Sequence, residues 1–404
     1  MNKKYENYSL IPKTLLAPDV ELSVDADTER SDKEKAHLLE ETFKSFGIGA
    51  KVIDIVHGNT VTRFVLTSET GTKASRIAGL HDELMMATAA SSLRIEVPVR
   101  GENSFYIELP NDHRVPVSLR GMVETDEYLN SSPLTVALGR DVLGNPLYCD
   151  IAKMPHLLIA GSVASGKSIC LHSLITSILV HSSPEDVRFI LIDTKIYEFC
   201  SFNGIPHLLM PVINDTGKAV NALKWAITEM RRRNELFAKE QVRDIKNYNE
   251  KYRSGTGEHL PNLLIVIDEF AELIMDYKEE MEESISKIAA LGRAAGIHLI
   301  MATQRPTCEV ITGVIKANIG SRIAFAVLTI WDSRSIIDEP GAEQLLGLGD
   351  MLYHPLTVPR PIRAQGVWVT EEEEDRIVDY LKKTYGAMYD EDIVKVIDRK
   401  NKDD

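Results

Sequence analysis

Apolar and polar residues alternate in short blocks over the first third of the chain, a pattern typical of a small α+β domain. Residues 50–56 and 60–66 each alternate with a period of two, and His57-Gly58-Asn59 lies between them. Alternation marks a half-buried strand, and a short connection containing Gly and Asn joins strands that pair, so a β-hairpin is predicted here. Two further strands and two helices are expected over residues 93–99, 106–110, 34–46 and 77–90.

A different pattern begins at Leu134, where short apolar runs alternate with longer stretches of helical spacing. This alternation predicts an α/β domain on a largely parallel sheet, because each crossover between parallel strands needs a helix-sized connection. The expected strands cover residues 187–193, 263–268, 297–302 and 322–327, and the expected long helices cover residues 217–238 and 285–295.

The chain therefore divides into four parts. We expect a flexible or loosely docked arm over residues 1–35, a smaller α+β domain over 36–120, a larger α/β domain over 134–370 and an acidic helical tail over 371–404. A length of 404 residues supports the division, because single cores rarely grow that large. No residue pattern in the smaller domain predicts catalysis.

The formal net charge of −14 would argue against a nucleic-acid partner if the charge were spread evenly. The run Glu371-Glu372-Glu373-Glu374-Asp375 and the final Asp403-Asp404 concentrate acidity late in the chain, so composition permits a locally basic channel elsewhere. No apolar run approaches the ~18 residues needed to span a bilayer. The four cysteines have no paired spacing. We therefore expect a cytoplasmic protein whose cysteines form no disulfide or metal site.

The first candidate for chemistry follows the apolar run 156–160. Gly161 is followed after four residues by Gly166-Lys167-Ser168 and then by helical spacing, the context in which G-x-x-x-x-G-K-S binds a nucleotide phosphate. The glycines let backbone N–H groups converge on one anion beside a helix N-terminus. Lys167 is expected to reach the β- and γ-phosphates and Ser168 to ligate Mg²⁺, which predicts ATP and Mg²⁺ as cofactors. The alternative is a Gly/Ser-rich turn with this spacing by chance. The residues expected around the phosphates are Gly161, Ser162, Val163, Ala164, Ser165, Gly166, Lys167, Ser168 and Ile169.

A second apolar run ends in Asp268-Glu269. Asp268 is expected to hold Mg²⁺, usually through water, and Glu269 to act as general base on the attacking water beside the γ-phosphate. We place this run and the one before Gly161 on neighbouring strands of a RecA-like sheet. The alternative is a strand that ends in two solvated acids.

Two further residues are candidates for the same site. Gln304 follows an apolar strand, where its side chain can contact the γ-phosphate and report its loss to the adjoining loop. A strand end that is merely polar is the alternative. Arg293 lies on a helix that ends in small residues, which permit close approach of another subunit. An arginine inserted into a neighbour's site raises the rate ~10³-fold or more, whereas an arginine on a helix surface has no such effect.

Seven strings of residues extend beyond these motifs. They are 152–161 (AKMPHLLIAG), 204–209 (GIPHLL), 293–299 (RAAGIHL), 302–306 (ATQRP), 311–319 (ITGVIKANI), 332–334 (DSR) and 341–352 (GAEQLLGLGDML). Together they resemble the FtsK/SpoIIIE family of DNA translocases, and the likeness runs from about residue 35 to residue 370.

The resemblance implies a RecA-like P-loop NTPase motor domain with a smaller N-terminal α+β domain. It also implies a hexameric ring that pumps double-stranded DNA through its centre, with ATP bound between subunits. In the family, the arginine matching Arg293 is the trans finger, and the positions matching Arg305, Lys316 and Arg334 lie in pore loops that touch the DNA backbone. Phosphate contacts suit a motor that is indifferent to sequence. The alternatives are that Arg334 caps the helix near Asp332 and that Lys316 is a solvated surface residue.

The chain also departs from the family pattern. Ser162-Val163-Ala164-Ser165 stands where a Thr-Gly-Ser-like run is usual, Thr194 replaces a proline, and Ile330 replaces a basic pore residue, so a weaker grip on DNA is expected. The sequence has no membrane-spanning N-terminal region and stops near the start of a sequence-reading winged-helix domain. We therefore expect a short motor of a phage, plasmid or conjugative element, with a membrane or recombinase partner supplied in trans. The alternatives are a conjugation- or secretion-coupling ATPase of the same superfamily, and a nucleotide-stabilised scaffold that does not hydrolyse.

Overall fold

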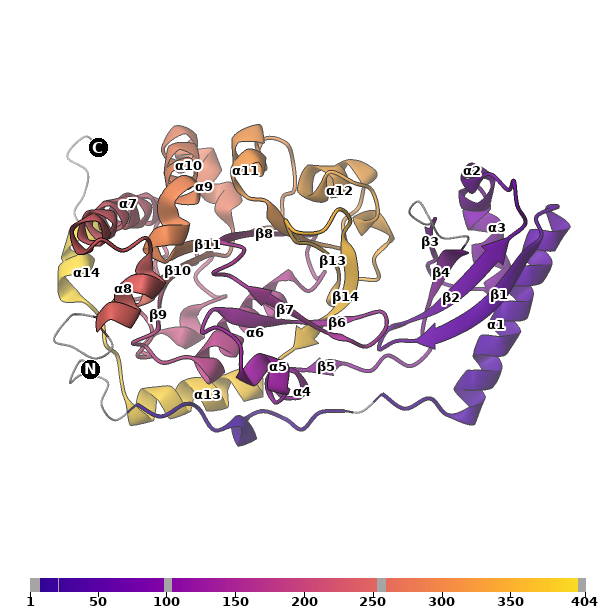
Figure 1. The fold of residues 1–404 in the computed structure, drawn as a ribbon, viewed down its shortest axis with the longest axis horizontal. Coiled ribbons are helices and arrows are strands. Elements are labelled where there is room, and N and C mark those ends of the chain that lie inside the picture. Colours follow the sequence, from indigo (N-terminus) through magenta and orange to yellow (C-terminus); the bar gives the residue numbers. More distant parts are fainter. Residues whose placement is uncertain (1–7, 21, 98–103, 253–258, 399–404) are drawn as a thin grey trace.

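The computed structural model describes residues 8–20, 22–97, 104–252 and 259–398. A smaller domain with an antiparallel sheet lies beside a larger α/β domain, as Figure 1 shows. Within the described ranges, no helix combines the length and the apolar character needed to cross a membrane.

The smaller domain has a four-stranded antiparallel sheet. Its strands are β1 (Ala50–His57), β2 (Val61–Ser68), β3 (Arg94–Glu96) and β4 (Ser104–Pro110). They lie in the order β1-β2-β4-β3. The predicted hairpin is confirmed, because β1 and β2 pair directly. The strand expected over 93–99 is shorter, and residues 98 and 99 lie outside the described residues.

Helices cover one face of this sheet. The helix expected over residues 34–46 begins earlier, where Asp25 caps its N-terminus by accepting a hydrogen bond from the Thr28 N–H (2.8 Å). Its first turns carry few apolar residues, so no helical period revealed them. The helix expected over residues 77–90 is interrupted at Gly79. The helices are α1 (Ala26–Ser45), α2 (Ala74–Ala78) and α3 (His81–Thr88).

The larger domain is built on one long sheet. Its strands are β5 (Val117–Ser118), β6 (Thr135–Asp141), β7 (Pro146–Asp150), β8 (His156–Ala160), β9 (Val187–Ile192), β10 (Asn262–Ile267), β11 (Ile297–Thr303), β12 (Ser321–Phe325), β13 (Asp350–His354) and β14 (Ile362–Trp368). Their order is β7-β6-β14-β13-β12-β8-β11-β10-β9, with β5 pairing to β14. The strands from β12 to β9 are parallel as predicted, whereas the strands from β13 to β7 extend the sheet antiparallel.

One predicted neighbour relation is wrong. β11 lies between β8, which leads into Gly161, and β10, which leads into Asp268-Glu269. After β8 the chain crosses to the sheet edge, forms β9 and β10 there, and returns with β11 beside β8. The two motifs therefore face each other across the end of a third strand.

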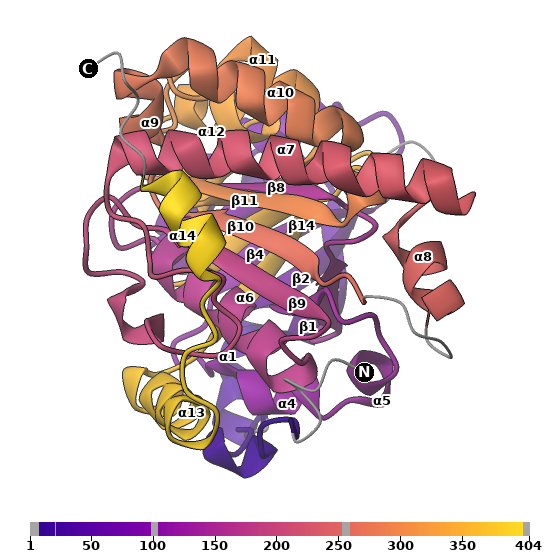
Figure 2. The ribbon, with the colours of Figure 1, turned by 90° about the vertical axis from the view of Figure 1, so that its left-hand side faces the viewer.

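Two layers of helices enclose this sheet, and Figure 2 shows them on opposite faces. One layer holds α4 (Leu119–Val123), α5 (Asp126–Leu129), α6 (Lys167–His181) and α13 (Glu371–Thr384). The other holds α7 (Thr216–Glu240), α9 (Phe270–Asp276), α10 (Lys278–Ala295), α11 (Gly313–Asn318), α12 (Ile330–Ile337) and α14 (Glu391–Ile397), with α8 (Ile245–Tyr252) beyond the end of α7. Because side chains alternate along a strand, Leu157 and Ile159 of β8 face the first layer, and Leu158 and Ala160 face the second.

The N-terminal segment and the acidic helix lie side by side (Figure 1). Ile11 and Leu16 are buried in the same core as Ile377 of α13. The Ala17 N–H also donates a hydrogen bond to Glu373 Oε1 (2.7 Å). Residues 8–20 of the expected arm and α13 of the expected tail therefore pack against each other and against the larger domain, because α13 has an apolar face, whereas residues 26–35 of the expected arm belong to α1 of the smaller domain.

Buried ion pairs join the two domains. Glu108 Oε2 on β4 accepts a hydrogen bond from Arg363 Nη1 on β14 (2.6 Å), and Oε1 accepts one from Arg63 Nη2 (2.6 Å). Arg363 also donates through Nε and Nη2 to Asp350 (3.0 and 2.7 Å). Burial opposes ionisation of Glu108, but Arg363, Arg94 and Arg63 outweigh it and hold its pKa far below the ordinary value. The charged carboxylate therefore ties one domain to the other.

Candidate active site

The predicted phosphate loop lies between β8 and α6, at the carboxyl edge of the parallel strands. Ala164 and Gly166 have φ angles of +61° and +112°, so the chain passes through the left-handed region before α6 begins. The Ser162 N–H donates to the Ala326 carbonyl (2.9 Å) and fixes the start of the turn. Along the loop, Gly161, Ser165 and Lys167 are buried, Ser162, Gly166 and Ser168 are half-buried, and Val163, Ala164 and Ile169 are exposed. The loop therefore leads directly into the N-terminus of α6, a position that favours binding of an anion.

A second turn, residues 347–349, packs against this loop. The Gly349 N–H donates to the Ser165 carbonyl (2.9 Å), and a Cβ on Gly166 would lie 2.5 Å from the Gly349 nitrogen. Glycine at 166 is therefore required both by its φ and by this close approach. Sequence reasoning missed the contact because it joins distant segments. Gly349, which contacts the loop, is followed by Asp350, which belongs to the interdomain ion pairs. The phosphate loop is therefore one residue away from that ion-pair network.

Lys167 and Asp268 form a buried ion pair. Lys167 Nζ contacts Asp268 Oδ1 and donates to the Asp268 carbonyl (3.2 Å), and both side chains are almost wholly buried. Burial raises the pKa of Asp268, and Lys167 opposes that rise. Among the described residues Asp268 Oδ2 has no hydrogen-bond partner, although Lys195 Nζ lies 3.8 Å away. The structure therefore brings the predicted phosphate and metal residues together.

Glu269 is buried and points to the end of β11. Its Oε1 accepts a hydrogen bond from Thr303 Oγ1, and its Oε2 accepts one from the Gln304 backbone N–H (2.9 Å). The Arg305 N–H in turn donates to Thr303 Oγ1 (3.0 Å). The end of β11 therefore connects Glu269, the candidate general base after β10, to Arg305, a candidate DNA-contacting residue. Gln304 is linked to Glu269 through its backbone N–H.

Lys195 was not assigned to the site from the sequence. Its Nζ lies 3.5 Å from Glu269 Oε2 as well as near Asp268. Burial lowers the pKa of Lys195, but the two carboxylates outweigh burial and raise it, so the ammonium is charged. Asp193 shapes this turn by accepting hydrogen bonds from the Lys195 and Ile196 N–H groups (3.0 Å each). An apolar strand ending in Asp-x-Lys was the available signal.

Ser168, the predicted metal ligand, touches a carboxylate that sequence reasoning also missed. Its Oγ donates to Glu198 Oε1 (3.0 Å). One helical turn later, His172 Nε2 lies 3.8 Å from Glu198 Oε2, and His172 Nδ1 contacts Glu374 Oε2 on α13. Burial lowers the pKa of His172, but Glu198 and Glu374 outweigh it and raise the pKa to about 9. The phosphate helix α6 is thus linked electrostatically to α13.

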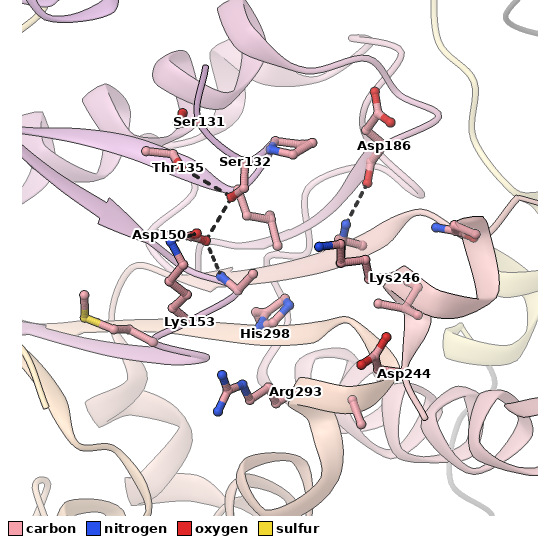
Figure 3. A pocket seen from close by; sticks show the side chains of 18 of the residues that line it. Ser131, Ser132, Thr135, Asp150, Lys153, Asp186, Asp244, Lys246, Arg293 and His298 are labelled. Atoms are coloured by element: carbon pink, nitrogen blue, oxygen red, sulfur yellow. Dashed lines mark hydrogen bonds and ion pairs between the residues drawn. The ribbon is translucent and has the colours of Figure 1, made fainter. Parts of the chain in front are cut away.

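Arg293 lies at the opposite edge of the sheet. It precedes β11, whereas the phosphate loop lies where these strands end, and seven residues of strand span about 20 Å. Its side chain lines a cleft with a volume of ≈ 1470 Å³. Figure 3 shows Arg293 among the other side chains that line this cleft. Other residues that line the cleft include Asp150, Lys153, Asp244, Lys246 and His298. Within the described residues, no ion pair or hydrogen bond engages its guanidinium. Arg293 therefore lies too far away to serve the phosphate loop of its own chain.

The structure brings together two of the three residues predicted to contact DNA. Lys316 on α11 contacts Asp338 and donates from Nζ to the Arg334 carbonyl (3.1 Å). Arg334 on α12 is exposed, with its guanidinium 5.5 Å from the centre of the Trp331 ring. Arg305 is exposed in the loop after β11.

Comparison with known proteins finds relatives of both domains. A profile described as the FtsK alpha domain matches residues 11–111, and one described as the FtsK/SpoIIIE family matches residues 119–308. The chain is 50% identical over 369 residues to the DNA translocase FtsK of Caldanaerobacter subterraneus subsp. tengcongensis. It is 43% identical over 402 residues to the DNA translocase SpoIIIE of Bacillus subtilis. These matches cover 91% and 97% of the chain but 51% and 50% of the relatives, so the chain spans about half the length of the curated relatives it matches.

A solved structure shares the fold. The pCW3 conjugation coupling protein TcpA, in a monomer form with ATPγS, matches with a TM-score of 0.60 at 21% identity. The match covers 86% of this chain and 99% of TcpA. The predicted fold class, a P-loop ATPase motor domain with a smaller N-terminal domain, is confirmed.

Proposed function

Because the chain belongs to the FtsK/SpoIIIE family, we propose that it is an ATP-hydrolysing motor that moves double-stranded DNA. The observation that carries this proposal is the hydrogen-bonded strand end that joins Glu269 to Thr303 and to the segment beginning at Gln304. Arg305 is the next residue, and its N–H donates to the same Thr303 hydroxyl. A DNA contact at Arg305 therefore acts directly on the groups that hold Glu269.

The donor set at the phosphate loop fits a nucleotide with Mg²⁺. Asp268 Oδ2 and Ser165 Oγ are buried, and neither has a hydrogen-bond partner in the part of the chain that the structure describes. Carboxylate and hydroxyl oxygens are the ligands that Mg²⁺ prefers. Ser168 and Asp268 would hold the ion, which supplies charge neutralisation at the β- and γ-phosphates.

The remaining groups perform hydrolysis. The N–H groups of the loop and Lys167 hold the phosphates, so the transferred phosphoryl group stays in line with an attacking water. Glu269 accepts the proton of that water. Lys195 Nζ lies 3.5 Å from Glu269 Oε2, beside this carboxylate.

We further propose that the chains form a ring, a hexamer, in which Arg293 of one copy completes the site of the next. Support comes from the placement of Arg293 at the sheet edge opposite the loop, in an open cleft (Figure 3). Of the small residues beside it, Ala294 is half-buried, whereas Ala295 and Gly296 are buried within the chain and offer no surface to another subunit, so that part of the expectation is wrong. The exposed side chains of Arg305 and Arg334 would then bind DNA phosphates, and such contacts do not depend on the base sequence.

Translocation is tested by measuring ATP turnover with and without linear duplex DNA, together with displacement of a third strand bound to that duplex. We expect duplex DNA to stimulate turnover and ATP to drive displacement. Turnover that is indifferent to duplex DNA but rises with a signal peptide would overturn the proposal. That result would favour the competing function, an ATPase that couples to conjugation or secretion.

The ring is tested by mixing inactive variants. Arg293→Ala alone and Glu269→Gln alone should each lose turnover, yet their mixture should recover part of it. In the mixed ring, an intact Glu269 of one copy faces an intact Arg293 of its neighbour. Arg293→Ala mixed with a chain that carries both substitutions is the matched control and should stay inactive. A kinetically silent Arg293→Ala variant would show that the arginine does not act in trans.

A further inference from the structure

Glu198 lies against the side chain predicted to ligate Mg²⁺, and no sequence motif pointed to it. Its Oε1 accepts the hydroxyl proton of Ser168 at 3.0 Å. Ser168 is the second residue of α6 and follows directly after the phosphate loop. The Glu198 side chain is 14% exposed, which leaves it largely shielded from solvent.

The hydroxyl of a metal-bound serine needs an acceptor. When such an oxygen gives a lone pair to the ion it keeps its proton, and that proton must be directed away from the metal. Asp268 is poorly placed to accept it, because one of its oxygens is engaged by Lys167 and the other is left for the metal shell. Glu198 is the carboxylate that the hydroxyl already contacts.

Glu198 lies beside His172, which is in turn held by a carboxylate on another helix. On α6, His172 lies one turn after Ser168, and its Nε2 is 3.8 Å from Glu198 Oε2. The other ring nitrogen of His172 contacts Glu374 Oε2 on α13, and Ser201 Oγ donates to Glu374 Oε1 (2.7 Å). The carboxylate therefore belongs to a network that runs from the phosphate helix to α13.

We propose that Glu198 is a positioning residue that orients the Ser168 hydroxyl for Mg²⁺ and so sets the metal affinity of the nucleotide complex. The inference rests on the Mg²⁺ site proposed above. Groups that orient metal ligands typically change metal affinity 10–100-fold when they are replaced. The contribution is distinct from general-base chemistry, which belongs to Glu269.

The test follows binding of a fluorescent ADP analogue, first in EDTA and then across a Mg²⁺ series. Glu198→Leu, which removes the acceptor, should raise the Mg²⁺ concentration needed for half-maximal binding about 10-fold or more, while affinity in EDTA stays native. Ser201→Ala, which removes a contact in the same network without touching Ser168, is the matched control and should keep the native Mg²⁺ series. The same shift should appear with Mn²⁺, whose bound-state EPR spectrum should also change.

A double-mutant cycle separates a direct effect from a general loss of structure. In a Ser168→Ala background, Glu198→Leu should add no further shift, because the hydroxyl that Glu198 orients is gone. If Glu198→Leu does not fold, Glu198→Asp, which draws the carboxylate back by one methylene, should show the shift instead. An unchanged Mg²⁺ series, or an equal loss of affinity in EDTA, would overturn this inference alone. Native protein that binds the nucleotide equally with and without Mg²⁺ would overturn the proposed metal site itself.

Discussion

Both carboxylate oxygens of Glu269 accept hydrogen bonds, one from Thr303 Oγ1 and one from the Gln304 N–H. Lys195 Nζ lies 3.5 Å from the same group. A general base must face the water that it deprotonates, so Glu269 has to give up part of this arrangement to act. The Thr303 hydroxyl is the partner that can be removed with least change to the main chain.

Thr303→Val keeps the branched shape and removes that hydroxyl. We expect ATP turnover without DNA to rise about fivefold, the effect of about 1 kcal/mol, because one restraint on Glu269 is lost. DNA stimulation should shrink by a similar factor in steady-state assays. Thr303→Ser retains the hydroxyl and should behave as the native chain does. A valine variant slower than native would mean that Thr303 aligns Glu269 for the reaction.

At this scale the sequence predicted residues that lie in contiguous motifs. Gly166, Lys167 and Asp268 could be found because their spacing and their flanking apolar runs are local. Lys195 had only the short Asp-x-Lys signal and Glu198 had none, because the role of both residues depends on how the turn after β9 folds toward α6 and β10. A single polar residue in a loop carries no period that would distinguish it from a solvated one.

Among the elements that carry candidate DNA contacts, α11 and α12 differ in how their cations are paired. Lys316 on α11 contacts Asp338. Burial raises the pKa of Asp338, but Lys316 and Arg322 outweigh burial and lower it. Arg334 on α12 is exposed, and Trp331 lies beside it. A neutralised ammonium releases fewer counterions on meeting a phosphate, so the two cations should contribute unequally.

Arg334→Ala should lower the slope of log affinity against log salt by about 1, because one phosphate contact is lost. Lys316→Ala should lower it clearly less. Fluorescence anisotropy of a labelled duplex, titrated over a salt series, measures both slopes. Equal losses from the two variants would mean that DNA draws Lys316 away from Asp338.

Element boundaries were predictable where an apolar period was strong. β10 and α7 follow their expected ranges closely, since both are bounded by polar turns. The place of β11 between β8 and β10 was not predictable, because chain order does not determine order in a sheet. Likewise, the acidic composition of α13 concealed its apolar face, which includes Ile377 and Leu381.

Buried ion pairs join the two domains at their boundary. Arg363 links Glu108 of the smaller domain to Asp350, which adjoins the turn that packs on the phosphate loop. All three side chains are nearly or wholly buried. Gly349 precedes Asp350, and its N–H donates to the carbonyl of Ser165, the residue before Gly166. A change in domain orientation that displaces Asp350 therefore reaches the phosphate loop through this hydrogen bond.

Glu108→Gln should weaken this boundary by up to about 3–5 kcal/mol, because Arg363, Arg94 and Arg63 lose the buried carboxylate that they share, although Asp350 still pairs with Arg363. The native carboxylate has a lowered pKa when folded, so its stabilisation is complete above the ordinary value of 4.5 and is lost as the pH falls below it. We therefore expect the variant to show a lower thermal midpoint at pH 7 and a flatter decline below pH 4.5. Glu96→Gln, at the partly exposed rim of the same network, is the matched control and should change the midpoint little. Equal effects of the two substitutions would mean that the stabilisation comes from the arginines' packing and not from the buried charge.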